Sequence, residues 1–248
     1  LPQAKEISPY RYVGVNFNSQ GNPNLKPSDH YNLDLKWDFN PTPTELISLT
    51  AFYKLIKNPI SRIEVASAGG YLSYENIADK ATVAGVEIEI RKNLFVRPVS
   101  NAAHGMNKLS LGLNGSYIYM NAKMPLATVT TGSQLEGAAP WIVNFDLSHN
   151  FTKGERSFVN TLVLNYVSDK IYTIGTQGYQ DVMEQGVLIL DFVSQAKLNK
   201  HLSLNLKARN LLNPSYKLSR KANENGEKVI LNDYKKGINI SLGVSCTF

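Results

Sequence analysis

The charged residues that have the types for chemistry lie at spacings typical of extended strands. Glu87 and Glu89 are two positions apart, so on a strand they share one face at roughly 6–7 Å, a separation that suits a shared cation. They lack a third ligand, and the four histidines fall on separate segments without metal-ligand spacing: His30, His104, His149 and His201. Asp146 and His149 have opposite parity on a strand, which argues against a catalytic pair on one face. We therefore expect no metal site, no cofactor and no enzymatic activity.

The segments that must position these residues alternate apolar and polar side chains. In YNLDLKWDF every second residue from Tyr31 to Phe39 is apolar, which rules out a helix and predicts a strand with one wet face. Such segments recur about nine times, each long enough for the roughly 9–11 residues that cross a bilayer at a tilt, whereas strands of soluble sandwiches average nearer five or six. They are residues 31–39, 46–55, 83–92, 108–119, 140–151, 158–166, 187–198, 201–209 and 237–248.

Composition narrows the class of protein. The chain has 248 residues, of which 43% are hydrophobic, and a formal net charge of +6 spread along its length, which favours solvated loops over nucleic-acid binding. It contains no apolar run near the roughly 18 residues of a membrane helix, but alternating strands of a membrane β-barrel remain compatible. The single cysteine, Cys246, excludes an internal disulfide. The opening residues LPQAKEISPY lack the features of a signal peptide, so we expect a processed chain or a piece of a longer one.

Short and long connections alternate between the predicted strands. The short ones lie near Pro41, Gly154 and Lys200, and one link, 93–107, is too long for its class. The long ones are residues 10–27, 57–80, 121–139, 172–185 and 212–236. Short turns at one end and long loops at the other are typical of outer-membrane barrels.

Aromatic residues on the apolar parity gather at the two ends of the strands, with aliphatic residues between them. Two such girdles match the two water interfaces of a membrane, whereas a soluble β-sandwich or solenoid, the alternative, has no reason to sort its aromatics this way. The predicted girdle comprises Trp37, Phe39, Tyr117, Tyr119, Trp141 and Tyr166, with Phe151, Phe158 and Phe248 at the short-turn end.

The polar parity supplies the candidates for a lumen. We expect Glu87, Glu89, Arg91, Asn144, Asp146, Asp191, Lys207 and Arg209 to face an enclosed interior, as part of a transport path, as contacts to a plug or simply as the polar lining any lumen needs. The loop tyrosines Tyr71, Tyr74, Tyr172 and Tyr179 are candidates for contact with a ligand that enters from outside. The basic loop 217–228 is either a binding site for lipopolysaccharide phosphates or a solvated loop.

Three segments carry a family resemblance. GNPNLKPS, residues 21–28, resembles the GNPxLKPE segment of TonB-dependent outer-membrane receptors, with Ser28 where an acidic residue is usual. NLLNPSY, residues 210–216, and GVSCTF at the end resemble their penultimate and terminal barrel segments. LISLTAFYKLIKNPI and AGVEIEIRKNL are similar to consecutive barrel strands of the Bacteroidota-type members.

The resemblance implies an antiparallel transmembrane β-barrel of 22 strands with a plugged lumen. This chain, residues 1–248, would supply about nine to ten C-terminal strands, counting a stub at 1–9, whereas the plug and the earlier strands have no counterpart in it. Implied partners are the TonB complex through the missing N-terminal region, the rest of the barrel and plug, outer-membrane lipid and lipopolysaccharide, and the barrel assembly machinery, for which Phe248 is the expected signal. A surface lipoprotein over the loops is left open.

The function that follows is active import of a scarce solute across the bacterial outer membrane. An iron chelate, haem, cobalamin, a peptide or a glycan would each fit. Two alternatives stand beside it: a smaller self-contained barrel that acts as a passive channel or adhesin, and an outer-membrane barrel hydrolase with its site at the loop rim. An upstream plug and TonB box would distinguish the importer from the channel, and a carboxylate and histidine converging at the loop rim would favour the hydrolase.

Overall fold

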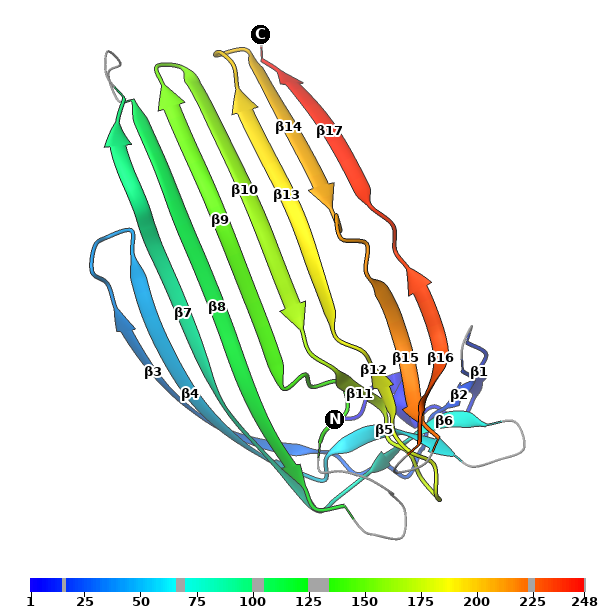
Figure 1. Cartoon of the computed structure of the whole chain (residues 1–248). Coiled ribbons are helices and arrows are strands. Elements are labelled where there is room, and N and C mark those ends of the chain that lie inside the picture. The colour runs from blue at the N-terminus through cyan, green and yellow to red at the C-terminus, as the bar shows by residue number, and fades with distance from the viewer. Residues whose placement is uncertain (15–16, 66–69, 100–104, 125–133, 223–225, 248) are drawn as a thin grey trace.

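The computed structural model describes residues 1–14, 17–65, 70–99, 105–124, 134–222 and 226–247. Its main feature is one curved antiparallel sheet of nine strands, in the order β17-β14-β13-β10-β9-β8-β7-β4-β3 (Figure 1). The strands are β3 (Asp29–Phe39), β4 (Leu46–Lys57), β7 (Lys80–Pro98), β8 (Met106–Ala122), β9 (Trp141–Lys153), β10 (Arg156–Val167), β13 (Val187–Lys197), β14 (Leu202–Arg209) and β17 (Asn239–Cys246). All nine strands predicted from alternation are present, so the all-β antiparallel architecture is confirmed.

The N-terminal residues differ from the prediction. We expected a strand stub at 1–9, but the chain forms a single helical turn, α1 (Ala4–Ile7). The Glu6 side chain accepts a hydrogen bond from the Gln3 backbone N–H at 2.7 Å, and the Glu6 N–H donates to the Gln3 carbonyl at 2.9 Å. This local capping satisfies backbone groups that a strand would have to pair with a neighbour.

The short connections all lie at one end of the large sheet, beside the C-terminal end of β17 (Figure 1). Between β9 and β10 the turn has two residues, and Gly154 adopts φ +60°, the conformation that a tight hairpin of this kind requires at its first position. The link 93–107, which seemed too long, is mostly strand: β7 and β8 stay paired past a bulge near Asn93 as far as Pro98 and Met106. The alternation of short and long connections therefore has no exception here.

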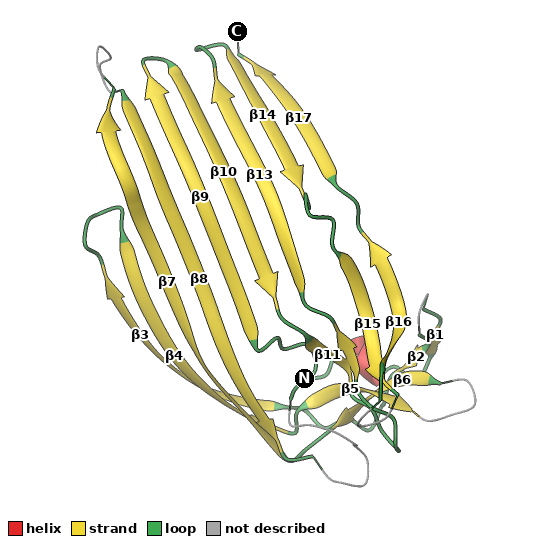
Figure 2. Cartoon of the chain, viewed as in Figure 1, coloured by secondary structure: helices red, strands yellow, loops and turns green. Residues whose placement is uncertain are grey.

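At the opposite end, the long connections contain strands that periodicity did not predict (Figure 2). They form two four-stranded sheets, ordered β1-β2-β6-β5 and β11-β12-β15-β16, which we call the cap. Their bounds are β1 (Arg11–Tyr12), β2 (Ser19–Gln20), β5 (Ile60–Val65), β6 (Tyr71–Asn76), β11 (Lys170–Thr173), β12 (Val182–Glu184), β15 (Ser215–Lys221) and β16 (Lys228–Lys235). Short alternating runs within polar loops give too weak a pattern to be recognised.

The two sheets of the cap meet over a buried apolar cluster. Ile63, Ile77, Ile171 and Ile174 form it, each at most 4% exposed. A parallel bridge joins Ile63 to Ile174, where the Glu64 N–H donates to the Ile174 carbonyl and the Ile174 N–H donates to the Arg62 carbonyl, both at 3.0 Å. The described core of the chain thus lies in the cap, whereas the large sheet is a single layer.

The large sheet has two unlike faces. On one parity, large apolar side chains stand exposed, including Leu33 at 71% and Leu242 at 72%. The other parity is polar on most strands and carries a hollow against β7, β8 and β9. In the described part of the chain no helix is long and apolar enough to span a bilayer, a finding that has no bearing on a β-barrel.

Candidate functional site

The hollow on the polar face has a volume of about 430 Å³ and brings together several of the predicted lumen residues. Glu89 and Arg91 reach it from β7, Asn144 and Asp146 from β9, and the newly found Asn114 from β8. The Arg91 guanidinium donates from Nε to Oε1 of Glu89 at 2.7 Å, so these opposite charges compensate each other. The wall is therefore polar, with little net charge at this point.

An amide ladder crosses three adjacent strands beside the hollow. Asn144 donates from Nδ2 to Oδ1 of Asn114 at 3.3 Å and accepts a short hydrogen bond from Nδ2 of Asn165. Sequence reasoning named Asn144 but missed Asn114 and Asn165, since only the register, Asn114 opposite Asn144 and Asn144 opposite Asn165, places them in one row. Such a ladder offers donors and acceptors to a neutral polar solute.

Asp146 occupies space that exists because residue 112 is a glycine. The two residues face each other on β8 and β9, and a Cβ on Gly112 would lie 2.1 Å from Oδ1 of Asp146. The carboxylate therefore lies over the backbone of β8, toward the side of the hollow that Arg91 lines. The arrangement fixes where this acceptor stands.

The remaining lumen candidates lie outside the hollow. Glu87 lies opposite Thr50 and Ser116, one row toward the cap from Glu89. Asp191 accepts a hydrogen bond at Oδ1 from the Asn210 N–H at 2.8 Å and so braces the end of β14. Lys207 and Arg209 lie on β14 opposite Ser241 and Asn239. The polar parity is thus distributed along the sheet rather than gathered into one site.

The polar face also carries apolar residues that alternation obscured. Val159 and Val163 of β10 share its parity with Thr161, and Val193 of β13 pairs directly with Thr161. Ile189, opposite Asn165, extends this patch toward the cap. A lumen filled only with water would leave these side chains uncovered.

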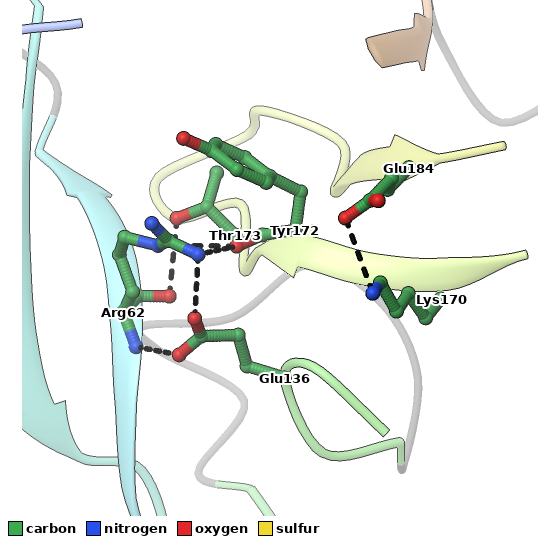
Figure 3. Close-up of polar contacts among 6 residues, drawn as sticks. All are labelled: Arg62, Glu136, Lys170, Tyr172, Thr173 and Glu184. Carbon is green, nitrogen blue, oxygen red and sulfur yellow. Dashed lines mark hydrogen bonds and ion pairs between the residues drawn. The ribbon is translucent and has the colours of Figure 1, made fainter. Parts of the chain in front are cut away.

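In the cap, Arg62 of β5 binds two other segments at once, and Figure 3 shows how they converge. Its backbone N–H and its Nη2 each donate to a carboxylate oxygen of Glu136 at 2.7 Å. Its Nε and Nη2 donate to the Tyr172 carbonyl at 3.1 and 2.8 Å, and its guanidinium carbon lies 4.1 Å from the Tyr172 ring centroid. Thr173 donates from its hydroxyl to the Arg62 carbonyl at 3.1 Å. Arg62 therefore joins β5, β11 and the loop after β8.

Glu64, on the same face of β5, repeats this role toward the other sheet. It forms an ion pair with Arg220 of β15, and both side chains are largely buried, at 15% and 16% exposure. Burial lowers the pKa of Arg220 below its ordinary value of 12.5. Sequence reasoning missed Arg62 and Glu64, and the available signal was their alternation with Ser61, Ile63 and Val65 inside a presumed loop.

The four loop tyrosines serve mainly to hold the cap together. Tyr172 packs on Arg62 as above, and the Tyr179 ring lies 5.3 Å from the Arg220 guanidinium carbon. Tyr71 lies 5.8 Å from the Arg11 guanidinium carbon. The Tyr74 carbonyl accepts a hydrogen bond from Asn22 at 3.0 Å, and burial raises the pKa of its phenol above 10.0. Of the four, Tyr179 is the most exposed, at 44%.

The basic loop 217–228 is partly neutralised. Nζ of Lys217 lies 3.7 Å from a carboxylate oxygen of Asp233, and Arg220 pairs with Glu64. Lys221 and Lys228 line a small hollow of about 190 Å³ beside Arg220. Two of the four basic groups thus have structural partners.

Two of the conserved-looking segments, 21–28 and 210–216, form corners between the large sheet and the cap. A Cβ on Gly21 would lie 2.5 Å from the Ser8 carbonyl oxygen, so only glycine lets this segment approach the residues after α1. In the other segment, Asn210 and Asn213 adopt φ +59° and +43°, and their side chains exchange hydrogen bonds with the Gly237 backbone at 2.7 and 3.1 Å. Both segments turn the chain sharply without leaving most backbone groups unpaired.

The predicted girdle residues are all exposed on the apolar face, at 38% to 57%. Tyr117 and Trp141 pack with ring centroids 4.5 Å apart at the cap end, and Trp37 and Phe39 stack at 6.1 Å at the short-turn end. Phe248 lies outside the described residues. Among the described residues, no group of three or more histidine, cysteine, aspartate or glutamate side chains converges as a metal site.

A single-layer antiparallel sheet with an apolar outer face, a polar hollowed inner face and short turns at one end is the wall of a membrane β-barrel. Comparison with protein families agrees: the model described as "TonB dependent receptor-like, beta-barrel" matches residues 1–211, and the chain belongs to that family. The family is one of outer-membrane TonB-dependent transporters rather than enzymes. Comparisons with curated proteins and with solved structures gave no match.

Proposed function

We propose that the chain is the C-terminal part of the barrel of a TonB-dependent transporter, supplying nine of 22 strands, and that the complete protein imports a scarce solute across the outer membrane. The observation that carries the proposal is the continuous alternation across the nine-stranded sheet, with exposed leucines on one face and the polar hollow on the other. Hydrocarbon outside and an enclosed interior inside account for both faces at once.

The open edges of the sheet support a larger barrel. In the described part of the chain, β3 and β17 each pair with one neighbour only. A membrane has no water to satisfy the other edge, so further strands must close the barrel. Those strands, the plug and the TonB-binding region belong to other parts of the complete protein in this proposal.

The inner apolar patch around Val163 and Val193 supports a plugged lumen over an open channel. Apolar side chains inside a barrel are stable when protein packs on them, and they lie on the polar parity, where lipid has no access. This observation favours the transporter over the passive channel.

The solute would enter past the cap and pass the amide ladder. The Asn114, Asn144 and Asn165 amides and the nearby hydroxyls suit solutes rich in hydroxyl and amide groups. Lipopolysaccharide at Lys221 and Lys228, the assembly machinery at the C-terminus and a surface lipoprotein over the cap are further proposed partners.

The test is growth and uptake in a strain that lacks the complete gene. Starved in turn of iron, haem, cobalamin, peptides and glycans, it should lose one uptake, and the wild-type gene should restore it only while the proton-motive force is intact. Asn144→Ala should weaken the restored uptake severalfold, whereas Val143→Ala, one residue away on the outer face, should not. Uptake that survives dissipation of the proton-motive force would contradict the proposal.

A further inference from the structure

The outer face carries basic and polar side chains near the short turns, where the rest of that face is apolar. Register places Arg97, Asn107, Phe151 and Phe158 in one row across β7, β8, β9 and β10, and Lys153 and Arg156 in the next row toward the turns. Directly paired residues point to the same side of a sheet. Because Leu147 and Leu162 pair two rows further toward the cap from Phe151, this side is the apolar one.

A third row, one step toward the cap, is polar. His149 pairs with Asn160, and Asn160 pairs with Ser194. Nε2 of His149 lies 2.8 Å from Oδ1 of Asn107, and the Ser194 hydroxyl donates to Oδ1 of Asn160 at 2.7 Å. Both contacts use the amide oxygen of an asparagine, so each Nδ2 group is left to donate to another acceptor. Polar side chains on a lipid-facing surface are costly unless they have partners there.

The depth of these rows fits a membrane interface. Trp141 and Phe151 mark the aromatic girdles on β9, and ten residues of tilted strand rise about 26 Å, close to the roughly 25 Å apolar band of such barrels. His149 therefore lies about 5 Å inside the girdle nearer the short turns, level with the ester and glycerol groups of a lipid. Arg97, Lys153 and Arg156 lie at or just outside that girdle, level with head groups.

Charge at this place favours an anion. Arg97, Lys153 and Arg156 are all exposed. The one carboxylate in the β9–β10 turn, Glu155, lies 3.5 Å from Nζ of Lys200, which offsets its charge. Phe151 and Phe158, with centroids 6.3 Å apart, provide an apolar floor for acyl chains beneath the cations.

We propose that this surface, Arg97, Asn107, His149, Phe151, Lys153, Arg156, Phe158, Asn160 and Ser194, binds the phosphate head group of an anionic phospholipid of the periplasmic leaflet. The cations hold the phosphodiester, the free amide donors meet its ester oxygens, and the phenylalanine pair packs on its chains. The inference rests on the proposed function for its orientation, because short turns face the periplasm in such barrels.

Native mass spectrometry of the complete receptor tests this, with phosphatidylglycerol and phosphatidylcholine of identical chains as probes. The wild type should retain phosphatidylglycerol at least about tenfold better, and Arg97→Gln/Lys153→Gln/Arg156→Gln should abolish the preference. The matched control Lys57→Gln/Lys80→Gln/Lys123→Gln removes three exposed cations at the cap end and should leave it unchanged.

Equal retention of the two lipids by the wild type, or an unchanged preference in the first triple variant, would overturn the proposal, as would equal loss in the control. Thermal unfolding of each variant confirms that it is folded. Solute uptake is measured on the same variants, and the first triple variant should keep it. Failure of the lipid site and failure of the transport proposal are thereby read separately.

Discussion

At the scale of single residues, the inner wall depends on one glycine. Asp146 fills the space over Gly112, and the same strand offers a second glycine, Gly115, where an added Cβ would have its nearest contact at 3.8 Å, the Ile88 Cγ2 atom. The two positions are three residues apart on β8, so they differ in their neighbours and little else. The geometry thus separates a packing role from the general flexibility of glycine.

We predict that Gly112→Ala displaces the Asp146 carboxylate and is less stable than Gly115→Ala by about 1–3 kcal/mol, because overpacking is added to the gain that alanine brings to a strand. Urea unfolding of the complete receptor, followed by its heat-modifiable migration, measures the difference. Equal free energies of unfolding for the two variants would show that Asp146 is not held in this position.

Arg62 gives the second prediction. Arg62→Gln removes the charged hydrogen bonds to Glu136 and Tyr172, and we expect a loss of about 1–3 kcal/mol in local stability because part-buried acceptors lose their donor. Hydrogen exchange at residues 171–174 should accelerate. Lys170→Gln is the matched control in the same cap, since its pair with Glu184 at 3.4 Å is worth less than about 1 kcal/mol. Similar exchange in both variants would argue against Arg62 as the joint between the segments.

At the scale of the strand, the two faces should respond oppositely to charge. Leu147→Arg puts a cation near the middle of the outer band and is expected to cost about 2–4 kcal/mol, whereas Ser148→Arg, on the inner face, should be tolerated. The yield of folded receptor in outer-membrane fractions and its urea midpoint check this. A tolerated Leu147→Arg would mean that this face does not meet hydrocarbon.

Much of the element level was predictable because alternation is a direct record of two-sided burial. YNLDLKWDF has one interpretation as β3, and the same holds for the other spanning strands. The stub at residues 1–9 was predicted wrongly because α1 depends on the capping contact between Gln3 and Glu6, which is local and not periodic. The strands of the cap were missed because runs such as β12, of three residues, are too short to show a period.

The site was predictable only in part, for a reason tied to register. Parity placed Glu89, Arg91, Asn144 and Asp146 on the inner face, and the structure gathers them around one hollow. Parity alone leaves open which strands are neighbours in depth, so the row of Asn114, Asn144 and Asn165 required the pairing itself. Partners 74 and 110 residues away in sequence, as for Arg62, carry no local signal at all.

At the scale of the whole molecule, the single-layer sheet needs completion. We predict that the 248-residue chain expressed alone does not insert stably, because β3 and β17 would each present an unpaired edge to lipid. The complete receptor should show heat-modifiable migration, and the isolated chain should not. A heat-modifiable, membrane-inserted product from the isolated chain would support a smaller self-contained barrel instead.

The most direct test of the central claim is accessibility along β9 in the complete receptor, with Cys246 replaced by serine. Spin labels placed singly at positions 142–150 and reconstituted in lipid are probed with oxygen, which concentrates in hydrocarbon, and with an aqueous nickel chelate. We predict that labels at Val143, Phe145 and Leu147 collide mainly with oxygen and those at Asn144, Asp146 and Ser148 with the chelate or with neither. Absence of this two-residue alternation, or its inversion, would contradict a barrel wall with lipid outside and a polar interior within.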